Sequence, residues 1–528
     1  MPRVLVCDPI SDEGVALLSE HAEVVDACGL DRAGLLAAIA DADAAIVRSA
    51  TALDAELIEA GRHLRVIARA GVGVDNIDVE AATRRGIAVV NTPTGNTIAA
   101  AEHAMAMLLA LARRIPTADA ALKAGRWAKQ QAIGRQLYGK TLGLIGLGKI
   151  GREMAKRARA FEMTIVAHDP YVPAERIAEL GVESVSLEEL LRRADAVSLH
   201  ATLTDESRGM IGAAQLAMMK PGALLVNCAR GGLVDEGALL EALRAGHLGG
   251  AALDVFEGEP EPNPELVRLP NVVATPHVAA STEEAQADVA REAARQVLEV
   301  LAGGRPRWPV NVPALSPEEL VAVGPFLPLA ENLGVLQAAM LTGAPRRAAL
   351  YLHGEPPEEH LRIISGHFLA GLLRQIADEP VNYVNAPLLA AERGLHTSRG
   401  AAADARGYSQ FLQATVADEA GETTVAGALL DRDRARIIEI AGFGVDLVPE
   451  RTVVLIWNAR PDRPGFVGTI GRMLGDAGIN ILGIQVAHEI IDGAGLMAVT
   501  VAEPVGAHVR REIAAHPDVA RLEVVRFD

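Results

Sequence analysis

The first ninety residues alternate short apolar runs with amphipathic segments. The apolar runs lie at 4–7, 44–47, 65–68 and 87–90, and their length and β-branched content predict buried strands. Segments between them, such as 54–60, have the spacing of apolar residues that is typical of helices. Strands that alternate with helices predict a parallel sheet with helices on its faces.

A second block of the same kind follows a long apolar segment at 96–114, which predicts a helix. The block extends to residue 275, and the segment at 282–302 predicts another long helix, which Gly303 and Gly304 end. Because this helix follows the second block directly, it can return the chain to the first. We therefore expect one discontinuous domain, residues 1–95 and 284–315, and a second domain, residues 96–283.

The pattern changes after a Pro-rich segment at 308–317, which we interpret as a linker. Residues 316–450 mix helices with several short strands, and this mixture predicts an α+β domain. The last segment, 451–528, has the order strand, helix, strand, strand, helix, strand. That order predicts a ferredoxin-like (βαββαβ) domain.

Composition places the chain among ordinary globular proteins. Half of its 528 residues are hydrophobic and 22% are charged, and its length suggests about three or four domains. The net charge of −18 disfavours nucleic acid as a partner. Three scattered cysteines predict neither a disulfide framework nor a metal site. Since the sequence has no signal-peptide pattern and no long apolar stretch, we expect a soluble cytoplasmic protein without a membrane partner.

A glycine-rich motif follows the predicted strand that begins the second block. Gly146, Gly148 and Gly151 have the GxGxxG spacing of a dinucleotide-binding turn, and a helix is predicted to start within the motif. Asp169 ends the next predicted strand, where its carboxylate can bind both ribose hydroxyls and repel a 2′-phosphate. The motif predicts a dinucleotide cofactor, and Asp169 favours NAD over NADP.

Three polar residues near the ends of later strands are candidates for catalysis. Arg230, Glu259 and His277 each have a structural alternative, as a strand-end salt bridge, a loop acid and a half-buried cap. Together they suit hydride-transfer chemistry. A histidine can take a hydroxyl proton, a carboxylate can orient its ring, and an arginine can hold a substrate carboxylate in two-point geometry.

Four segments around these residues resemble the D-isomer-specific 2-hydroxyacid dehydrogenases: GLGKIG, NCARGGLVDE, ALDVFEGEP and TPHVAAST. The resemblance implies an α/β enzyme with a Rossmann-type NAD domain and a flavodoxin-like substrate domain, in which Arg230, Glu259 and His277 are catalytic. It also implies a set of cofactor-binding residues, namely Gly146, Gly148, Lys149, Ile150, Gly151, Asp169, Cys228, Ala229, Arg230, Asp254, His277 and Ala280.

Three further segments, AIVRSAT, RAGVGVDNID and NTPTGNTIAAAEH, resemble members of the family that oxidise 3-phosphoglycerate in the first step of L-serine synthesis. Two arginines after predicted strands suit a substrate with both a carboxylate and a phosphate. The resemblance implies substrate contacts from Arg48, Arg69, Val72, Gly73 and Asn96. It also implies that Lys129 contacts the site of a neighbouring subunit. Relatives usually have a short Lys/Arg run at this position, whereas the segment AKQQ here contains one cation, Lys129.

The remaining residues resemble regulatory modules of long-form members. Residues 316–450 resemble their intervening domain, and 451–528 resemble an ACT domain, a module that binds amino acids. The resemblance implies L-serine as effector, held by Asp462 and Asn480, although relatives often have an aromatic residue in place of Arg460. It also implies a homotetramer. Two alternatives remain open: another 2-hydroxyacid dehydrogenase, such as a glyoxylate or 2-oxoglutarate reductase, and a non-enzymatic NAD-sensing scaffold of the same fold.

Overall fold

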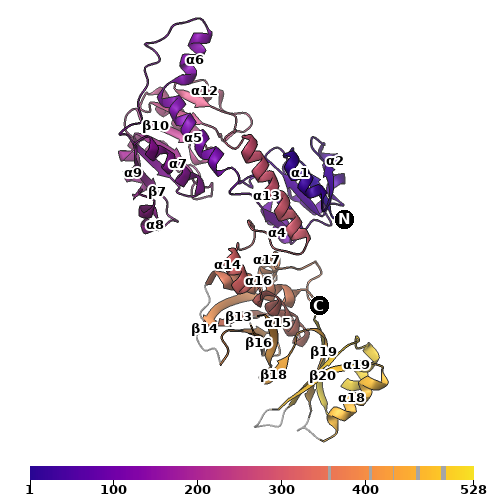
Figure 1. Ribbon diagram of the computed structural model, residues 1–528. Coiled ribbons are helices and arrows are strands. Elements are labelled where there is room, and N and C mark those ends of the chain that lie inside the picture. The colour runs from indigo at the N-terminus through magenta and orange to yellow at the C-terminus, as the bar shows by residue number, and fades with distance from the viewer. Residues whose placement is uncertain (355–357, 403–406, 432, 460–463, 489–494, 528) are drawn as a thin grey trace.

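The computed structural model describes residues 1–354, 358–402, 407–431, 433–459, 464–488 and 495–527. Within these residues the chain forms four β-sheets that follow one another along the sequence. The first two sheets and their helices lie next to each other at one end of an elongated molecule, and the third and fourth extend away from the first (Figure 1).

The first sheet is parallel, with strand order β2-β1-β3-β4-β5. Its elements are β1 (Arg3–Val6), α1 (Asp12–Ser19), β2 (Glu23–Asp26), α2 (Arg32–Ile39), β3 (Ala44–Val47), α3 (Ala55–Ala60), β4 (Val66–Arg69), α4 (Val79–Arg84) and β5 (Ala88–Val90). This strand order confirms the flavodoxin-like prediction. The sequence pattern does not predict β2, because this edge strand has only two apolar residues.

The second sheet is also parallel, with order β12-β11-β10-β9-β6-β7-β8. Its strands are β6 (Thr141–Ile145), β7 (Thr164–His168), β8 (Glu183–Ser184), β9 (Ala196–Leu199), β10 (Leu224–Asn227), β11 (Gly250–Leu253) and β12 (Val272–Ala274). Its helices are α5 (Thr97–Ala112), α6 (Ile115–Lys123), α7 (Lys149–Ala160), α8 (Ala174–Glu179), α9 (Leu187–Arg193), α10 (Ala213–Met218), α11 (Glu236–Arg244) and α12 (Pro264–Val267). The order reverses between β6 and β9, which confirms the Rossmann-type prediction and marks where a dinucleotide binds.

Helix α13 (Glu283–Leu301) follows the second sheet in sequence but packs on the first. Its buried Val289, Ala293 and Val297 share a core with Val4 and Ile46 of the first sheet. This packing supports the discontinuous first domain, and we retain the four expected domain boundaries as a proposal.

The third sheet is mixed, with order β14-β13-β15-β16-β17-β18, in which only the β13–β14 pair is parallel. Its elements are α14 (Pro317–Val323), α15 (Phe326–Met340), β13 (Arg347–His353), α16 (Glu358–Leu373), α17 (Ala386–Glu392), β14 (His396–Ala402), β15 (Phe411–Ala417), β16 (Glu422–Leu430), β17 (Arg434–Ile440) and β18 (Phe443–Leu447). Buried side chains of α15 and α16, including Leu333 and Phe368, form a core with the sheet. An α+β domain was predicted here.

The fourth sheet is antiparallel, with order β20-β21-β19-β22. Its elements are β19 (Arg451–Asn458), α18 (Phe466–Asp476), β20 (Ile481–His488), β21 (Gly495–Val501), α19 (Ala507–Ala514) and β22 (Val519–Phe527). The order of strands and helices is the predicted ferredoxin-like one.

In the described part of the chain, no helix is long and apolar enough to cross a membrane. The same residues contain no group of three or more His, Cys, Asp or Glu side chains that could hold a metal ion. Cys7, Cys28 and Cys228 are free thiols.

Candidate active site

The glycine motif forms the turn between β6 and α7. Gly146 has a φ of +90°, and a Cβ there would lie 2.7 Å from the His200 carbonyl oxygen. A Cβ on Gly151 would lie 2.3 Å from the Gly146 carbonyl oxygen, so α7 can pack this closely against the turn only when residue 151 is glycine. A Cβ on Gly148, in contrast, would meet no atom of the described residues within 4 Å. The open space at Gly148, next to the N–H groups that begin α7, fits a dinucleotide pyrophosphate.

Asp169 lies directly after β7 and beside this turn. Its Oδ2 accepts a hydrogen bond from the Leu147 N–H at 2.7 Å, and its Oδ1 accepts one from the Tyr171 N–H at 2.9 Å. Two backbone donors thus fix the carboxylate next to the glycine turn. An adenosine ribose that follows a pyrophosphate at Gly148 would meet a fixed acceptor there.

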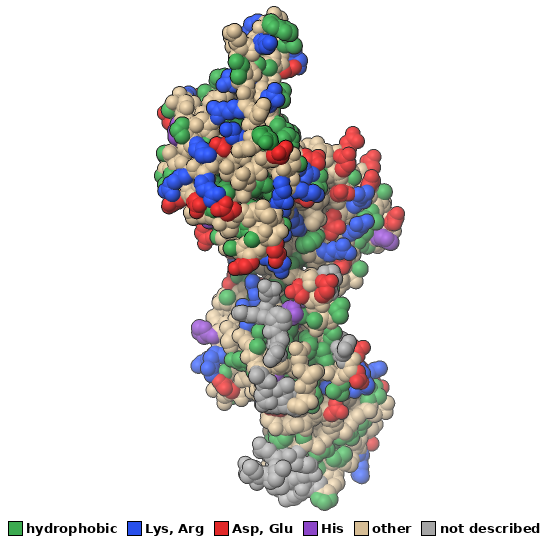
Figure 2. Space-filling view, turned by 60° about the vertical axis from the view of Figure 1, so that its left-hand side comes forward, with side chains coloured by type: hydrophobic (Ala, Val, Ile, Leu, Met, Phe, Trp, Pro, Cys, Tyr) green, Lys and Arg blue, Asp and Glu red, His purple; other side chains and the backbone are tan. Residues whose placement is uncertain are grey.

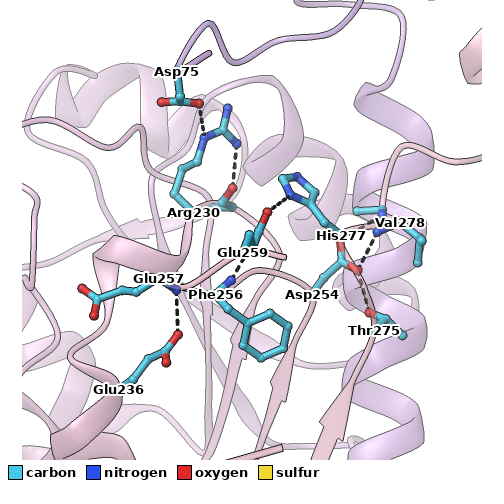
Figure 3. Close-up of polar contacts among 12 residues, drawn as sticks. Asp75, Arg230, Glu236, Asp254, Phe256, Glu257, Glu259, Thr275, His277 and Val278 are labelled. Carbon is cyan, nitrogen blue, oxygen red and sulfur yellow. Dashed lines mark hydrogen bonds and ion pairs between the residues drawn. The ribbon is translucent and has the colours of Figure 1, made fainter. Parts of the chain in front are cut away.

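His277 and Glu259 form a hydrogen-bonded pair (Figure 3). The distance from His277 Nδ1 to Glu259 Oε2 is 2.7 Å, and Glu259 Oε1 accepts the Phe256 N–H at 2.9 Å. Burial tends to raise the pKa of Glu259, but these two hydrogen bonds outweigh burial and hold the pKa below its usual range. Because a carboxylate only accepts, Nδ1 of His277 carries the hydrogen and Nε2 remains to take a proton.

Asp254 lies beneath this pair and holds the loop that carries His277. Its side chain is fully buried and accepts hydrogen bonds from the Thr275 hydroxyl at 2.6 Å and from the Val278 and Ala279 N–H groups at 2.8 and 2.9 Å. Burial alone raises its pKa, whereas bonds from His103, Thr275 and these amides lower it, with a net decrease. The carboxylate is therefore ionised and acts as a fixed anchor.

Arg230 follows β10 and faces the first sheet. Its Nε lies 3.1 Å from Asp75 Oδ2, and its Nη1 donates to the Ala229 carbonyl at 2.7 Å. A Cβ on Gly73 would lie 1.8 Å from Arg230 Nη2, so only glycine allows this approach. The guanidinium of Arg230 is thus held by both domains.

Arg69 and Arg48 follow β4 and β3 of the first sheet. Burial, together with the nearby charges of Arg48 and Arg230, lowers the pKa of Arg69 to about 10. Among the described residues, the buried Arg69 Nε has no hydrogen-bond partner, and neither has the buried Oδ1 of Asn96. Mutual repulsion of three cations makes this region favourable for an anion.

A cavity of about 870 Å³ lies between the first and second sheets and collects these groups. Its lining includes the predicted residues Arg48, Arg69, Val72, Gly73, Asn96, Arg230, Glu259, His277 and Ala280. A proton acceptor, its carboxylate partner and the three predicted arginines therefore face one space, which Arg208 also lines. This arrangement can hold a small dianionic substrate and remove a proton from it.

Other predicted cofactor residues lie around the second sheet. Lys149 begins α7, and Ile150 follows it. Ala229 is held through its N–H by Asn227 Oδ1 at 3.1 Å. Burial and the neighbouring Asp254 raise the pKa of Cys228, so this thiol stays protonated.

Lys129 and Asn480 are not among the residues that line the cavity. Lys129 is exposed in the segment after α6. Asn480 precedes β20 in the fourth sheet, and its N–H donates to Glu503 Oε2 at 2.7 Å. Asp462 and Arg460 lie outside the described residues.

The polar residues of the site that were not predicted include Asp75 and His103. Asp75 pairs with Arg230, and His103 on α5 lies 3.1 Å through Nε2 from the Thr275 hydroxyl and 3.4 Å from Asp254. Both lie inside segments that resemble the family, and His103 is, with Thr97 and Glu102, one of the few polar residues on a largely apolar helix. That contrast is a usable sequence signal for His103.

Comparisons with known proteins match most of the chain. Residues 105–279 match the NAD binding domain of D-isomer specific 2-hydroxyacid dehydrogenases, and residues 322–441 match the D-3-phosphoglycerate dehydrogenase intervening domain.

Two curated relatives are D-3-phosphoglycerate dehydrogenases. The one from Methanocaldococcus jannaschii is 42% identical over all of both chains, and the one from Mycobacterium tuberculosis is 41% identical over 99% of each. Among solved structures, a glyoxylate reductase from Paecilomyes thermophila is 33% identical with a TM-score of 0.55, and it covers 58% of this chain and 98% of its own.

Proposed function

The chain belongs to the D-3-phosphoglycerate dehydrogenases of the D-isomer-specific 2-hydroxyacid dehydrogenase family, and on this premise we propose that it oxidises D-3-phosphoglycerate to 3-phosphohydroxypyruvate with NAD, the first step of L-serine synthesis. The observation that carries the proposal is the common cavity of the Glu259–His277 pair and the arginines Arg48, Arg69 and Arg230. Carboxylate and phosphate are the two anions of this substrate, and the cavity offers cations for both.

Each residue has a distinct task in the proposed reaction. When bound at the glycine turn, NAD supplies the ring that accepts the hydride. His277 takes the hydroxyl proton through Nε2, and the ionised Glu259 orients the ring and stabilises its protonated form. Arg230 holds the substrate carboxylate, and Arg48 and Arg69 hold its phosphate.

A turnover assay tests this function. Purified protein with NAD at alkaline pH should form NADH in proportion to added 3-phosphoglycerate. Replacing His277 with Asn should lower kcat by roughly 10²- to 10⁴-fold, because the proton acceptor is lost, while NAD still binds. Absence of 3-phosphoglycerate-dependent NADH formation by the wild-type chain would contradict the proposal.

The same assay discriminates the alternatives. A glyoxylate or 2-oxoglutarate reductase would prefer a substrate without phosphate, so faster turnover of glyoxylate than of the phosphorylated pair would favour it. An NAD-sensing scaffold would bind NAD without turnover of any hydroxyacid. Arg69, whose Nε has no partner within the described residues, supports a phosphorylated substrate.

We also propose that the chain forms a homo-oligomer, with a homotetramer as the expected state. Helix α6 and the residues after it project from the second sheet (Figure 1), and hydrophobic side chains lie on this projection (Figure 2). Leu122, Ile133 and Tyr138 are exposed there, and Trp127 is 83% exposed. A cluster of exposed apolar side chains of this kind suggests contact with a second subunit. Such a contact would also bring Lys129 near the active site of that subunit.

Analytical ultracentrifugation tests the proposed interface. Replacing Trp127 with Glu should shift the chain to a smaller species, because a charge would be buried in the contact. Val321, which is 80% exposed on α14, provides a matched control, and its replacement with Glu should leave the assembly unchanged. A monomeric wild-type chain, or an intact oligomer in the Trp127 variant, would contradict this assignment.

The fourth sheet and its helices are proposed to be an ACT domain that binds L-serine through Asp462 and Asn480. The ferredoxin-like topology supports the module, and Asn480 directly precedes β20. Calorimetric titration with L-serine tests it, and Asn480→Ala should abolish the heat of binding. We place the reaction in the cytoplasm, and the three free thiols are consistent with that compartment.

A further inference from the structure

The side chain of Lys149 has an unusual partner for a residue at a phosphate-binding turn. Its ammonium lies 4.2 Å from the centroid of the Trp308 ring. The described residues provide no carboxylate that forms an ion pair with it, and burial lowers the pKa of this lysine. Lys149 is the first residue of α7, directly after Gly148 and the open space next to it.

The backbone of Trp308 is fixed to the edge of the first sheet. Its carbonyl accepts the Asn91 N–H at 3.2 Å, and its N–H donates to Gln296 Oε1 at 2.9 Å. Gln296 is fully buried on α13, and its Nε2 donates to the Asn91 carbonyl at 2.8 Å. Two residues later, the Val310 N–H donates to the Val89 carbonyl at 2.7 Å. The main chain of Trp308 is therefore held on both sides, and from this fixed position its ring contacts Lys149 at the start of α7.

We propose that Trp308 is a positioning residue for the cofactor, whose ring holds the Lys149 ammonium beside Gly148 for the pyrophosphate of NAD. An ammonium has three N–H donors, so it can face an aromatic ring on one side and a phosphate on the other. A lysine without a carboxylate partner also keeps its whole charge for the ligand. The inference rests on the NAD-binding function proposed above and adds a residue from the other domain to that site.

The contact makes cofactor binding depend on a residue outside the nucleotide-binding sheet. Trp308 lies in the segment that leaves α13 and leads to the third sheet, whereas Lys149 begins α7, the helix after strand β6 of the second sheet. The pyrophosphate of NAD would therefore be held by both domains at once.

Binding measurements with single and double variants test the proposal. Trp308→Leu should weaken the affinity for NAD and for ADP-ribose by roughly 2- to 30-fold, the range expected for loss of a partly buried cation–π contact. The affinity for adenosine, which has no pyrophosphate, should not change. Trp308→Phe, which retains an aromatic face, should lose less. KM for NAD should rise while kcat stays near the wild-type value, because His277 and Glu259 are untouched.

A double-variant cycle separates the contact from a general structural effect. In a Lys149→Met background, Trp308→Leu should cause no further loss of ADP-ribose affinity, since the ring then has no cation to hold. The control is Trp457→Leu in the fourth sheet, where the ring faces the Arg521 guanidinium at 5.2 Å, and it should leave ADP-ribose affinity unchanged.

The outcomes separate this inference from the function itself. Unchanged or tighter ADP-ribose binding by Trp308→Leu, an equal loss of adenosine affinity, or additive losses in the double variant would each overturn the positioning role. A wild-type chain that binds no NAD would overturn the proposed function and this inference with it. Normal NAD binding by Trp308→Leu would overturn the inference alone.

Discussion

At the scale of single residues, the site depends on charges whose counter-ions come from the ligand. Arg48 and Arg69 lie on the first sheet, and among the described residues no carboxylate pairs with either guanidinium group. The guanidinium of Arg230 pairs with one carboxylate there, that of Asp75. Burial lowers the pKa of Arg69, and repulsion from the nearby Arg48 and Arg230 acts in the same direction. A substrate with several negative charges relieves that repulsion, so affinity should depend on the phosphate.

Replacing Arg48 with Ala should therefore raise KM for 3-phosphoglycerate by roughly 10- to 100-fold, the effect of a charged hydrogen bond. KM for 2-oxoglutarate, which has no phosphate, should change little. Steady-state kinetics on both substrates measure the difference, with Arg32→Ala as control, because Arg32 pairs with Asp54 and Glu56 away from the cavity. Equal changes for both substrates would remove Arg48 from the phosphate site.

A second residue-scale prediction concerns cofactor choice. Asp169→Ala should bring kcat/KM for NADP closer to that for NAD, because the acceptor for the ribose hydroxyls and the repulsion of a 2′-phosphate are both lost. Because Asp169 also accepts the Leu147 N–H, activity with NAD should fall as well. An unchanged ratio of the two kcat/KM values would argue against this role.

At the scale of elements, the sequence pattern predicted the strands and helices that have regularly spaced apolar residues. It missed strands that lack such a pattern and are defined by pairing with a neighbouring strand. Most strands of the two parallel sheets are apolar runs, and the strands of the fourth sheet and its helices also follow the predicted order. In β14 the segment HTSRGAA has no apolar alternation, because it lies at a sheet edge and pairs in parallel with β13. Such a strand is stabilised by its neighbour rather than by a buried face of its own.

The candidate catalytic residues could be proposed from the sequence for a related reason. Arg230, Glu259 and His277 stand within motifs along the chain, so sequence comparison finds them. Asp75 and Trp308 act through partners 155 and 159 positions away in sequence, Arg230 and Lys149 respectively, and no local pattern joins these pairs. Contacts between domains could therefore be identified only from the structure.

The loop that carries His277 gives an element-scale prediction. Asp254→Asn should destabilise the fold by roughly 1–3 kcal/mol at neutral pH, because the amide cannot accept all the bonds that the carboxylate accepts. The folded-state pKa of Asp254 lies below its ordinary value of 3.8, so its stabilising contribution is present above that pH and is lost as pH falls through the folded-state value.

Thermal melts at several pH values measure this contribution. The difference in Tm between wild type and Asp254→Asn should be large at pH 7 and shrink below about pH 3.8, the ordinary value for this group. Asp41→Asn, at an exposed site, serves as control. A difference in Tm that does not depend on pH would mean that the charge of Asp254 is not what stabilises the loop.

At the scale of the whole molecule, a buried polar network joins the linker to the third sheet's helices. Arg305 Nη2 lies 2.8 Å from His367 Nε2, and His367 Nδ1 lies 3.3 Å from Glu331 Oε2. The His367 ring stacks on Tyr383 with centroids 4.8 Å apart. Since arginine only donates, the imidazole must be neutral and accept at Nε2. The network fixes the linker to α15 and α16.

Arg305→Ala should loosen this connection and speed proteolytic cleavage within residues 303–317, because the main chain there would open more often. Arg307→Ala, two positions along at an exposed site, should cleave at the wild-type rate. Mass spectrometry of limited digests locates and times the cuts. Equal cleavage of both variants would show that the network does not hold the linker.

The return of α13 to the first sheet also affects how the protein is made. On the ribosome, β1 to β5 emerge first, but the apolar face that contains Val4 and Ile46 lacks its covering helix until residue 301 has been added. The second sheet, whose strands and helices lie within one continuous stretch, has every part available before then. The N-terminal sheet is therefore begun first and completed second, and a chain stalled before α13 would leave the ribosome with an apolar face open to chaperones.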